Sequence, residues 1–245
     1  MVTCQATIGR LDGSRARGSV GVVAQRFIRA RNAEQKELRR AHLLETARDL
    51  LAGGCELHDL GLNELARTAG VAKANVYRYF ESREAVLLEL FWTEAEAWWT
   101  ELAPQLRSRR VLGATIALLV RTLVRRPSLC ALLAAVPAVL EQNVSEETIR
   151  AFKHRTLAFY RQAAGVFTRS CAELTEGAWM AMLHDVSTVM VGVYPATHPS
   201  APAAAASQDA ALGFFRRDFA TELERLLLAV AASHATKQVF RTGRA

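Results

Sequence analysis

The segment LNELARTAGVAKANVYRYFESRE, residues 62–84, decides the fold that we expect for this chain. Two short helices that cross steeply need a small residue where they touch and a residue that tolerates positive φ at the turn. Ala66 and Gly70 meet these two demands. Apolar anchors flank the turn on both sides: Leu65, Ala69, Val71 and Val76. The segment therefore predicts a helix-turn-helix, with helices near 62–69 and 73–79.

The outer face of the second of these helices carries side chains suited to DNA. Lys and Arg neutralise phosphates, Asn pairs with an adenine edge in the major groove, and a Tyr hydroxyl reaches phosphate oxygens. These residue types occur together with a small residue that lets a helix approach the groove: Lys73, Ala74, Asn75, Tyr77 and Arg78. A solvent-exposed helix tolerates the same side chains, so composition alone leaves an ordinary surface helix as an alternative.

The whole local arrangement resembles the TetR family of bacterial transcriptional regulators. The family signature runs G-V-[ST]-x-x-x-[LV]-Y-x-[HY]-F-x-[ST]-[KR]-E, and this chain reads GVAKANVYRYFESRE over residues 70–84. The resemblance covers about residues 35–90. By matching position, it implies phosphate contacts from Lys73, Tyr77, Tyr79 and Arg83. It also implies that the residues closest to the bases are Ala74, Asn75 and Arg78.

Two positions depart from the family pattern. The family usually has Ser or Thr as the cap of the first motif helix and before Lys73, whereas this chain has Gly61 and Ala72. Glycine caps a helix nearly as well as Ser or Thr, but alanine caps poorly, at a cost of about 1 kcal/mol of local helix stability. We therefore expect a looser recognition helix in the free protein.

Helix signals continue through the rest of the chain, so we expect an all-α fold. An amphipathic run beginning at Gln35 precedes the motif and stops at Gly53 and Gly54. Ser82 is a suitable N-cap for a long helix, and Pro137 should kink or split a later one. The helices expected after the motif lie near 82–103, 109–125, 127–141, 145–171, 175–194 and 208–235.

Composition and motif together divide the chain into three segments. Residues 1–33 hold six arginines and one acidic residue, and we expect a flexible basic arm that either threads a minor groove or is a solvated tail. Residues 34–90 are expected to form a three-helix, helix-turn-helix DNA-binding domain. Residues 91–245 are expected to form a C-terminal helical bundle for dimerisation and ligand binding, with a mobile loop at about 195–207.

The C-terminal segment is rich in aromatic residues at helical spacing. Aromatic, histidine and methionine side chains recur there: Trp92, Trp98, Trp99, Phe152, His154, Phe159, Tyr160, Trp179, Met182 and His184. Such side chains are most often core, although an apolar cavity with a few polar groups is also what a small ligand requires. The resemblance implies an effector pocket in this region, but the ligand-binding residues stay unknown at this stage.

The last two expected helices contain GAWMAMLHDVSTVMVGVY and LGFFRRDFATELERLLLAV. Both carry more apolar surface than a peripheral helix needs. Either they cover the core, or they pair with their copies in a four-helix dimer interface, which the resemblance also implies. We expect a homodimer, because two recognition helices one DNA turn apart are needed to read a palindrome.

Several other classes of protein find no support. The cysteines Cys4, Cys55, Cys130 and Cys171 are scattered without zinc-like spacing, so we expect no metal and no cofactor. There is no Gly-rich phosphate loop or nucleophile elbow, so we expect no enzyme activity. The apolar runs are too short for a membrane span, so we expect a cytoplasmic protein. The net charge of +7 suits a polyanionic partner.

The sequence thus predicts a ligand-responsive repressor that binds a pseudo-palindromic double-stranded DNA operator as a homodimer. A small-molecule effector of unknown identity is its expected ligand. The rival hypothesis is an all-α interaction protein that has lost DNA binding and acts through a protein partner.

Overall fold

The computed structural model describes the backbone of residues 16–242 and the side chains of residues 34–235. Those residues contain no strand, which confirms the all-α prediction. The first group of elements is α1 (Ala16–Ala52), α2 (Leu62–Thr68), α3 (Lys73–Tyr77) and α4 (Arg83–Gln105). The second group is α5 (Leu112–Val124), α6 (Pro127–Ala135), the π-helix η1 (Val136–Leu140), α7 (Glu146–Ser170), α8 (Glu176–Thr197), α9 (Ala201–Ala206), the 3₁₀-helix η2 (Ala210–Phe215) and α10 (Phe219–Thr242).

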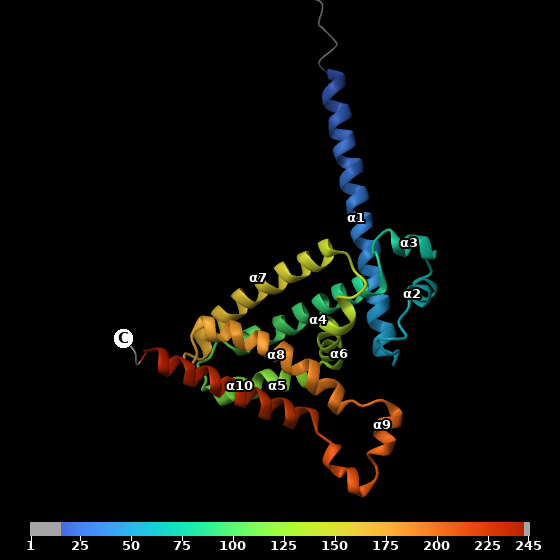
Figure 1. The fold of residues 1–245 in the computed structure, drawn as a ribbon. Helices are drawn as coiled ribbons and strands as arrows, with labels where there is room; N and C mark the ends of the chain where they lie inside the picture. The colour runs from blue at the N-terminus through green and yellow to red at the C-terminus, as the bar shows by residue number, and fades with distance from the viewer. Residues whose placement is uncertain (1–15, 243–245) are drawn as a thin grey trace, which may run out of the picture.

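Helix α1 is longer than the sequence pattern predicted. It begins at Ala16 rather than near Gln35, and its first part extends away from the rest of the molecule (Figure 1). No proline interrupts the run, so the helix continues through segments of weak periodicity. The expectation of a flexible arm is therefore wrong for residues 16–33, which are helical. The part of that expectation that concerns residues 1–15 lies outside the described residues.

Helices α2 and α3 form the predicted helix-turn-helix. Gly70 has φ +67°, the left-handed conformation that the turn was expected to need. The amide of Val71 donates to the Ala66 carbonyl over 3.0 Å, which closes the turn. Of the four predicted anchors, Leu65 and Val76 are buried, whereas Ala69 and Val71 are half-buried against the core. Ala66 at the helix contact and Phe80 are buried as well. The local prediction from residues 62–84 is thus confirmed for the turn and its core.

Helix α4 leads from the helix-turn-helix into the C-terminal bundle (Figure 1). Ser82 caps it as predicted, because its Oγ accepts a hydrogen bond from the Ala85 amide over 3.1 Å. Near its start α4 packs on α1, where Arg40 pairs with Glu89 over 3.0 Å. Farther along, α4 packs against α5, α6 and α7. One helix therefore belongs to both halves of the protein.

Helix α8 lies at the centre of the C-terminal bundle, packed against α6, α7 and α10. Its Trp179 is fully buried and stacks on Phe167 of α7, with ring centroids 4.7 Å apart. The Trp179 Nε1–H donates to the Cys171 carbonyl over 3.1 Å, so the polar edge of the ring is satisfied. This layer of apolar side chains places α7 on one side of α8 and α10 on the other.

Two boundaries in the C-terminal half test the predictions made from prolines. The expected helix at 127–141 splits into α6 and η1 next to Pro137, as predicted. The expected loop at 195–207 is largely helical, because α8 continues to Thr197 and α9 follows. Alanine-rich sequence favours helix strongly enough to override the neighbouring prolines at the helix ends. The last helix starts at Phe219 rather than near residue 208.

Candidate functional site

The outward face of α3 brings together the side chains that the sequence proposed for DNA. Five of them are exposed: Lys73, Ala74, Asn75, Tyr77 and Arg78. Val76, between them, is fully buried, so it fixes the orientation of the helix on the domain. The Lys73 Nζ lies 5.8 Å from the centroid of the Tyr77 ring, at cation–π distance. These residues define the recognition surface.

Helix α3 is short and has no side-chain cap at its start. Ala72 is the N-cap residue, and it supplies no side-chain hydrogen bond. The helix ends at Tyr77, and the turn is completed by the Tyr79 amide, which donates to the Val76 carbonyl over 2.9 Å. The Tyr79 side chain is half-buried against the core rather than on the exposed face. Tyr79 is therefore less available to DNA than Tyr77.

Arg83 occupies a different position from the other predicted phosphate ligands. Its guanidinium pairs with Glu84 over 2.8 Å and donates to the His58 carbonyl over 2.9 Å. Glu84 is itself buried, with 6% of its surface exposed. In the free protein Arg83 thus joins the loop after α1 to the start of α4. A phosphate contact by Arg83 stays a prediction. To make it, the guanidinium must share its hydrogen bonds with Glu84 and the His58 carbonyl or release them.

Glu81 makes a contact that the sequence reasoning missed. Its Oε1 accepts hydrogen bonds from the Ser145 amide, over 2.9 Å, and from the Ser145 Oγ, over 3.1 Å. Hydrogen bonds from Thr148 and Ser145 hold the pKa of Glu81 below its usual range. Ser145 caps α7, so Glu81 links the end of the helix-turn-helix to α7. No local sequence signal predicts this pair, because its members lie far apart in the chain.

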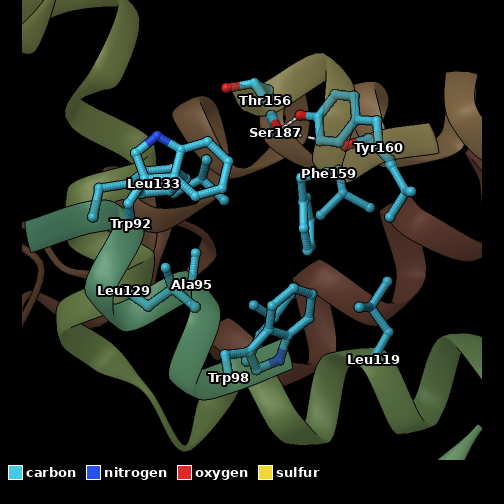
Figure 2. Close-up of a pocket in the computed structure, with 14 residues that line it drawn as sticks. Trp92, Ala95, Trp98, Leu119, Leu129, Leu133, Thr156, Phe159, Tyr160 and Ser187 are labelled. Carbon is cyan, nitrogen blue, oxygen red and sulfur yellow. Dashed lines mark hydrogen bonds between the residues drawn. The ribbon is translucent and has the colours of Figure 1, made fainter. Parts of the chain in front are cut away.

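A partly open cavity of about 60 Å³ lies in the C-terminal half (Figure 2). Its wall is built from α4, α5, α6, α7 and α8. The lining residues are Phe91, Trp92, Ala95, Trp98, Leu119, Leu123, Leu129, Leu133, Thr156, Phe159, Tyr160, Leu183, Val186 and Ser187. Four of the aromatic residues singled out in the sequence line it, namely Trp92, Trp98, Phe159 and Tyr160. His154 and His184 are exposed and do not line it.

Few polar atoms face this cavity. The Tyr160 hydroxyl and the Ser187 Oγ form a hydrogen bond of 2.6 Å. Burial raises the pKa of Tyr160, and the hydrogen bond with Ser187 opposes part of that rise. The Trp98 Nε1–H donates to Thr122 over 3.0 Å, whereas the Trp92 Nε1 is buried without a hydrogen-bond partner in the structure. The Thr156 hydroxyl donates to the Phe152 carbonyl of its own helix over 2.9 Å. The cavity therefore offers one hydroxyl pair, Tyr160 and Ser187, within a largely apolar wall.

The described residues contain no group of three or more His, Cys, Asp or Glu side chains arranged to hold a metal ion. No single helix among the described residues is long and apolar enough to span a membrane. The segments Leu112–Val124 and Pro127–Leu140 have sufficient length and apolar character only when they are taken together, and they are bent by 96° relative to each other.

Comparisons with known proteins cover both halves of the chain. Residues 43–90 match the family described as bacterial regulatory proteins, tetR family, and residues 92–232 match the tetracyclin repressor-like C-terminal domain. A solved structure described as a tetR family transcription regulator from Shewanella sp. PV-4 is 21% identical, with a TM-score of 0.44. That match covers 72% of this chain and 95% of the other. No curated protein matches the chain.

Proposed function

We propose that this chain, which belongs to the TetR family of bacterial transcriptional regulators, is a ligand-responsive repressor that binds a pseudo-palindromic operator as a dimer. The observation that carries the proposal is the course of α4. Its start supports the helix-turn-helix through Ser82 and Glu89, and its middle forms a wall of the cavity through Trp92 and Trp98. A molecule that enters the cavity therefore pushes on a helix that also holds the DNA-binding domain.

The recognition surface supports direct reading of the major groove. Asn75 carries the side-chain amide that pairs with adenine, and Ala74 beside it allows close approach. Lys73 and Tyr77 reach phosphates on either side and hold the helix in register. Because all of these side chains except the small Ala74 are polar, the exposed face of α3 is suited to DNA rather than to an apolar protein partner.

The dimer would form through α8 and α10, which pack along each other. Small side chains are exposed along α8: Gly177, Ala181, Thr188 and Gly192. Leu228 of α10 is also exposed, although it is apolar. Small residues allow helices from two copies to approach closely, and burial of apolar surface drives their association. To read a palindrome, such a dimer must hold the two α3 helices about 34–36 Å apart, one turn of DNA.

A chain of contacts runs from the cavity wall to the recognition unit. The Arg155 guanidinium of α7 lies 4.6 Å from the centroid of a Trp92 ring and pairs with Glu89 over 3.6 Å. Glu89 also pairs with Arg40 of α1, whose guanidinium lies 5.2 Å from the centroid of the Phe80 ring. Displacement of α4 or α7 by a ligand would alter these contacts and the bond between Glu81 and α7. Ligand and DNA would then weaken each other's binding by the same factor.

The first experiment measures fluorescence-anisotropy binding of the full chain to DNA that flanks its own gene. Scrambled DNA of the same length is the control, and both are titrated at two salt concentrations. We expect tight, sequence-selective binding whose affinity falls as salt rises, because phosphate contacts release counterions. Equal, weak binding to both DNAs would contradict recognition of this operator and favour the partner-binding hypothesis.

A further inference from the structure

We propose that the cavity in Figure 2 binds a neutral, planar aromatic molecule that carries one hydrogen-bonding group. The inference rests on the proposed function, because it names the chemical class of the effector. It is drawn from the shape, charge and polar atoms of the cavity wall.

Aromatic rings surround the open centre of the cavity. The Phe159 ring lies 6.0 Å from Trp92 and 6.5 Å from Trp98, measured between centroids, at interplanar angles of 74° and 52°. Figure 2 shows these three rings around the central space. Aromatic rings pair by offset stacking and by edge-to-face contact, so walls tilted in this way present both a face and edges to a flat guest. The shape therefore favours a ring system over a flexible chain.

The wall carries no charge to match a charged ligand. Among the lining residues, all of which belong to the part of the chain that the structure describes, none is Asp, Glu, Lys, Arg or His. Arg155 contacts Trp92 but does not line the cavity, and its charge is already paired with Glu89 and Glu96. A charged molecule would lose its hydration here without gaining an opposite charge. The cavity thus selects neutral molecules.

The hydroxyl pair of Tyr160 and Ser187 supplies the polar contact. Each hydroxyl has one hydrogen to donate and two lone pairs. Their mutual hydrogen bond uses one donor and one acceptor, and the Ser187 Oγ also donates to the Leu183 carbonyl over 3.4 Å. Acceptor capacity therefore remains for a ligand O–H or N–H. Because burial raises the pKa of Tyr160, the phenol stays protonated at neutral pH. One correctly placed polar group on the ligand satisfies this pair.

The cavity must also enlarge when it is filled. Its volume of about 60 Å³ is well below the roughly 150 Å³ of an engineered cavity that holds benzene. An aromatic ring can enter only if side chains of the wall move outward, and α4 and α7 form part of that wall. Those helices hold Ser82 and Ser145, the two caps next to the recognition unit. An enlargement that shifts α4 or α7 would therefore also disturb the contacts at these two caps.

Three matched compounds test the inference by isothermal titration calorimetry on the full chain: naphthalene, 2-naphthol and 2-naphthoate. They share one ring system and differ in a hydroxyl and a charge. We expect 2-naphthol to bind about fivefold tighter than naphthalene, as one added hydrogen bond would give. We expect 2-naphthoate to bind at least about tenfold more weakly than 2-naphthol, because its charge is not compensated.

Two variants connect these affinities to the cavity. Tyr160→Phe should lower the affinity for 2-naphthol to that for naphthalene and leave naphthalene unchanged. Tyr194→Phe is the matched control, because the Tyr194 hydroxyl donates to the Pro127 carbonyl outside this cavity. Ala95→Phe should fill the space and abolish binding of all three compounds. If Ala95→Phe does not fold, the 2-naphthol affinities of Tyr160→Phe and Tyr194→Phe still test whether the ligand binds at the Tyr160 hydroxyl.

The inference is overturned by any of three results: 2-naphthoate binds as tightly as 2-naphthol, no compound binds, or Tyr160→Phe preserves the preference for 2-naphthol. Failure of the proposed function gives a different pattern. If 2-naphthol binds as expected but the protein does not select its operator, the ligand chemistry holds and the regulator hypothesis fails. If DNA is recognised and the compounds do not bind, only the inference about the ligand fails.

Discussion

The recognition surface and the cavity are built by opposite means. The recognition surface consists of near neighbours in sequence that α3 and its C-cap turn outward: Lys73, Ala74, Asn75, Tyr77 and Arg78. The cavity collects side chains from helices distributed between Phe91 and Ser187, and turns them inward. Exposed polar side-chain ends form the recognition surface, and buried aromatic rings form much of the cavity wall. A local surface can be altered one residue at a time, whereas an inner wall responds as a packed unit.

The largest expected effect comes from the buried anchor under the recognition surface. Val76→Asp should destabilise the helix-turn-helix by more than about 3 kcal/mol and abolish DNA binding, because it buries an unpaired charge. The free energy of unfolding and DNA anisotropy measure this. Val111→Asp is the matched control at an exposed N-cap, where Asp is tolerated. Val76→Asp should leave binding of 2-naphthol intact, because no residue of the helix-turn-helix lines the cavity. Loss of that binding would show that the destabilisation spreads through α4 into the cavity wall.

Asn75 and Tyr77 separate reading of bases from contact with phosphates. Asn75→Ala should reduce discrimination between operator variants by about 1–3 kcal/mol, because a bidentate contact to a base is lost. Tyr77→Phe should weaken binding to all sequences about equally. Anisotropy titrations against a set of operator variants measure both. Unchanged discrimination in Asn75→Ala would show that Asn75 does not read a base.

The turn at Gly70 tests how far the backbone conformation alone supports the recognition surface. Gly70→Ala should cost about 1–2 kcal/mol in the free energy of unfolding, because the left-handed conformation strains any residue with a Cβ. Apart from its chain neighbours, no heavy atom of the described residues lies within 4 Å of a Cβ added at Gly70, so the cost is conformational. Gly113→Ala in α5 has the same open space without the positive φ, and should be neutral or stabilising. Equal effects of the two variants would contradict a role for φ.

The missing cap of α3 predicts a gain in stability. Ala72→Ser should stabilise the recognition helix by about 1 kcal/mol, because Ser can accept a hydrogen bond from an amide of the first turn. The midpoint temperature of thermal unfolding and the affinity for the operator should both rise. Gly61→Ser at the cap of α2 should change stability by only a few tenths of a kcal/mol, since Gly caps nearly as well. A gain at position 61 equal to that at position 72 would contradict this account.

The smallest effect concerns the contact of Glu81 with α7. The pKa of Glu81 is lower in the folded protein than in the unfolded chain, where about 4.3 is usual. Its contribution to stability is therefore complete above about pH 4.3 and is lost as pH falls through the lower, folded pKa. An NMR titration of the Glu81 carboxyl carbon, with Thr148→Val as the control that removes one donor, measures the shift. A midpoint at or above 4.3 in the unaltered protein would contradict it.

The sequence predicted best the features whose causes are local. The positive φ of Gly70, the cap by Ser82 and the break at Pro137 each depend on one residue and its immediate neighbours. The helical start of α1 and helix α9 were missed, because the Gly, Ser and Pro residues there were interpreted as signals of flexible chain. Helix propensity and continuity prevailed over those signals.

The sequence by itself determined the all-α fold, the helix-turn-helix and the set of side chains on the outward face of α3, because spacing within one helix fixes which residues share a face. Only the tertiary structure decided that Arg83 is held by Glu84 and that Glu81 reaches Ser145. It also decided which aromatic residues enclose the cavity. These outcomes depend on how distant helices pack, and packing is a property of the assembled core that no local pattern contains.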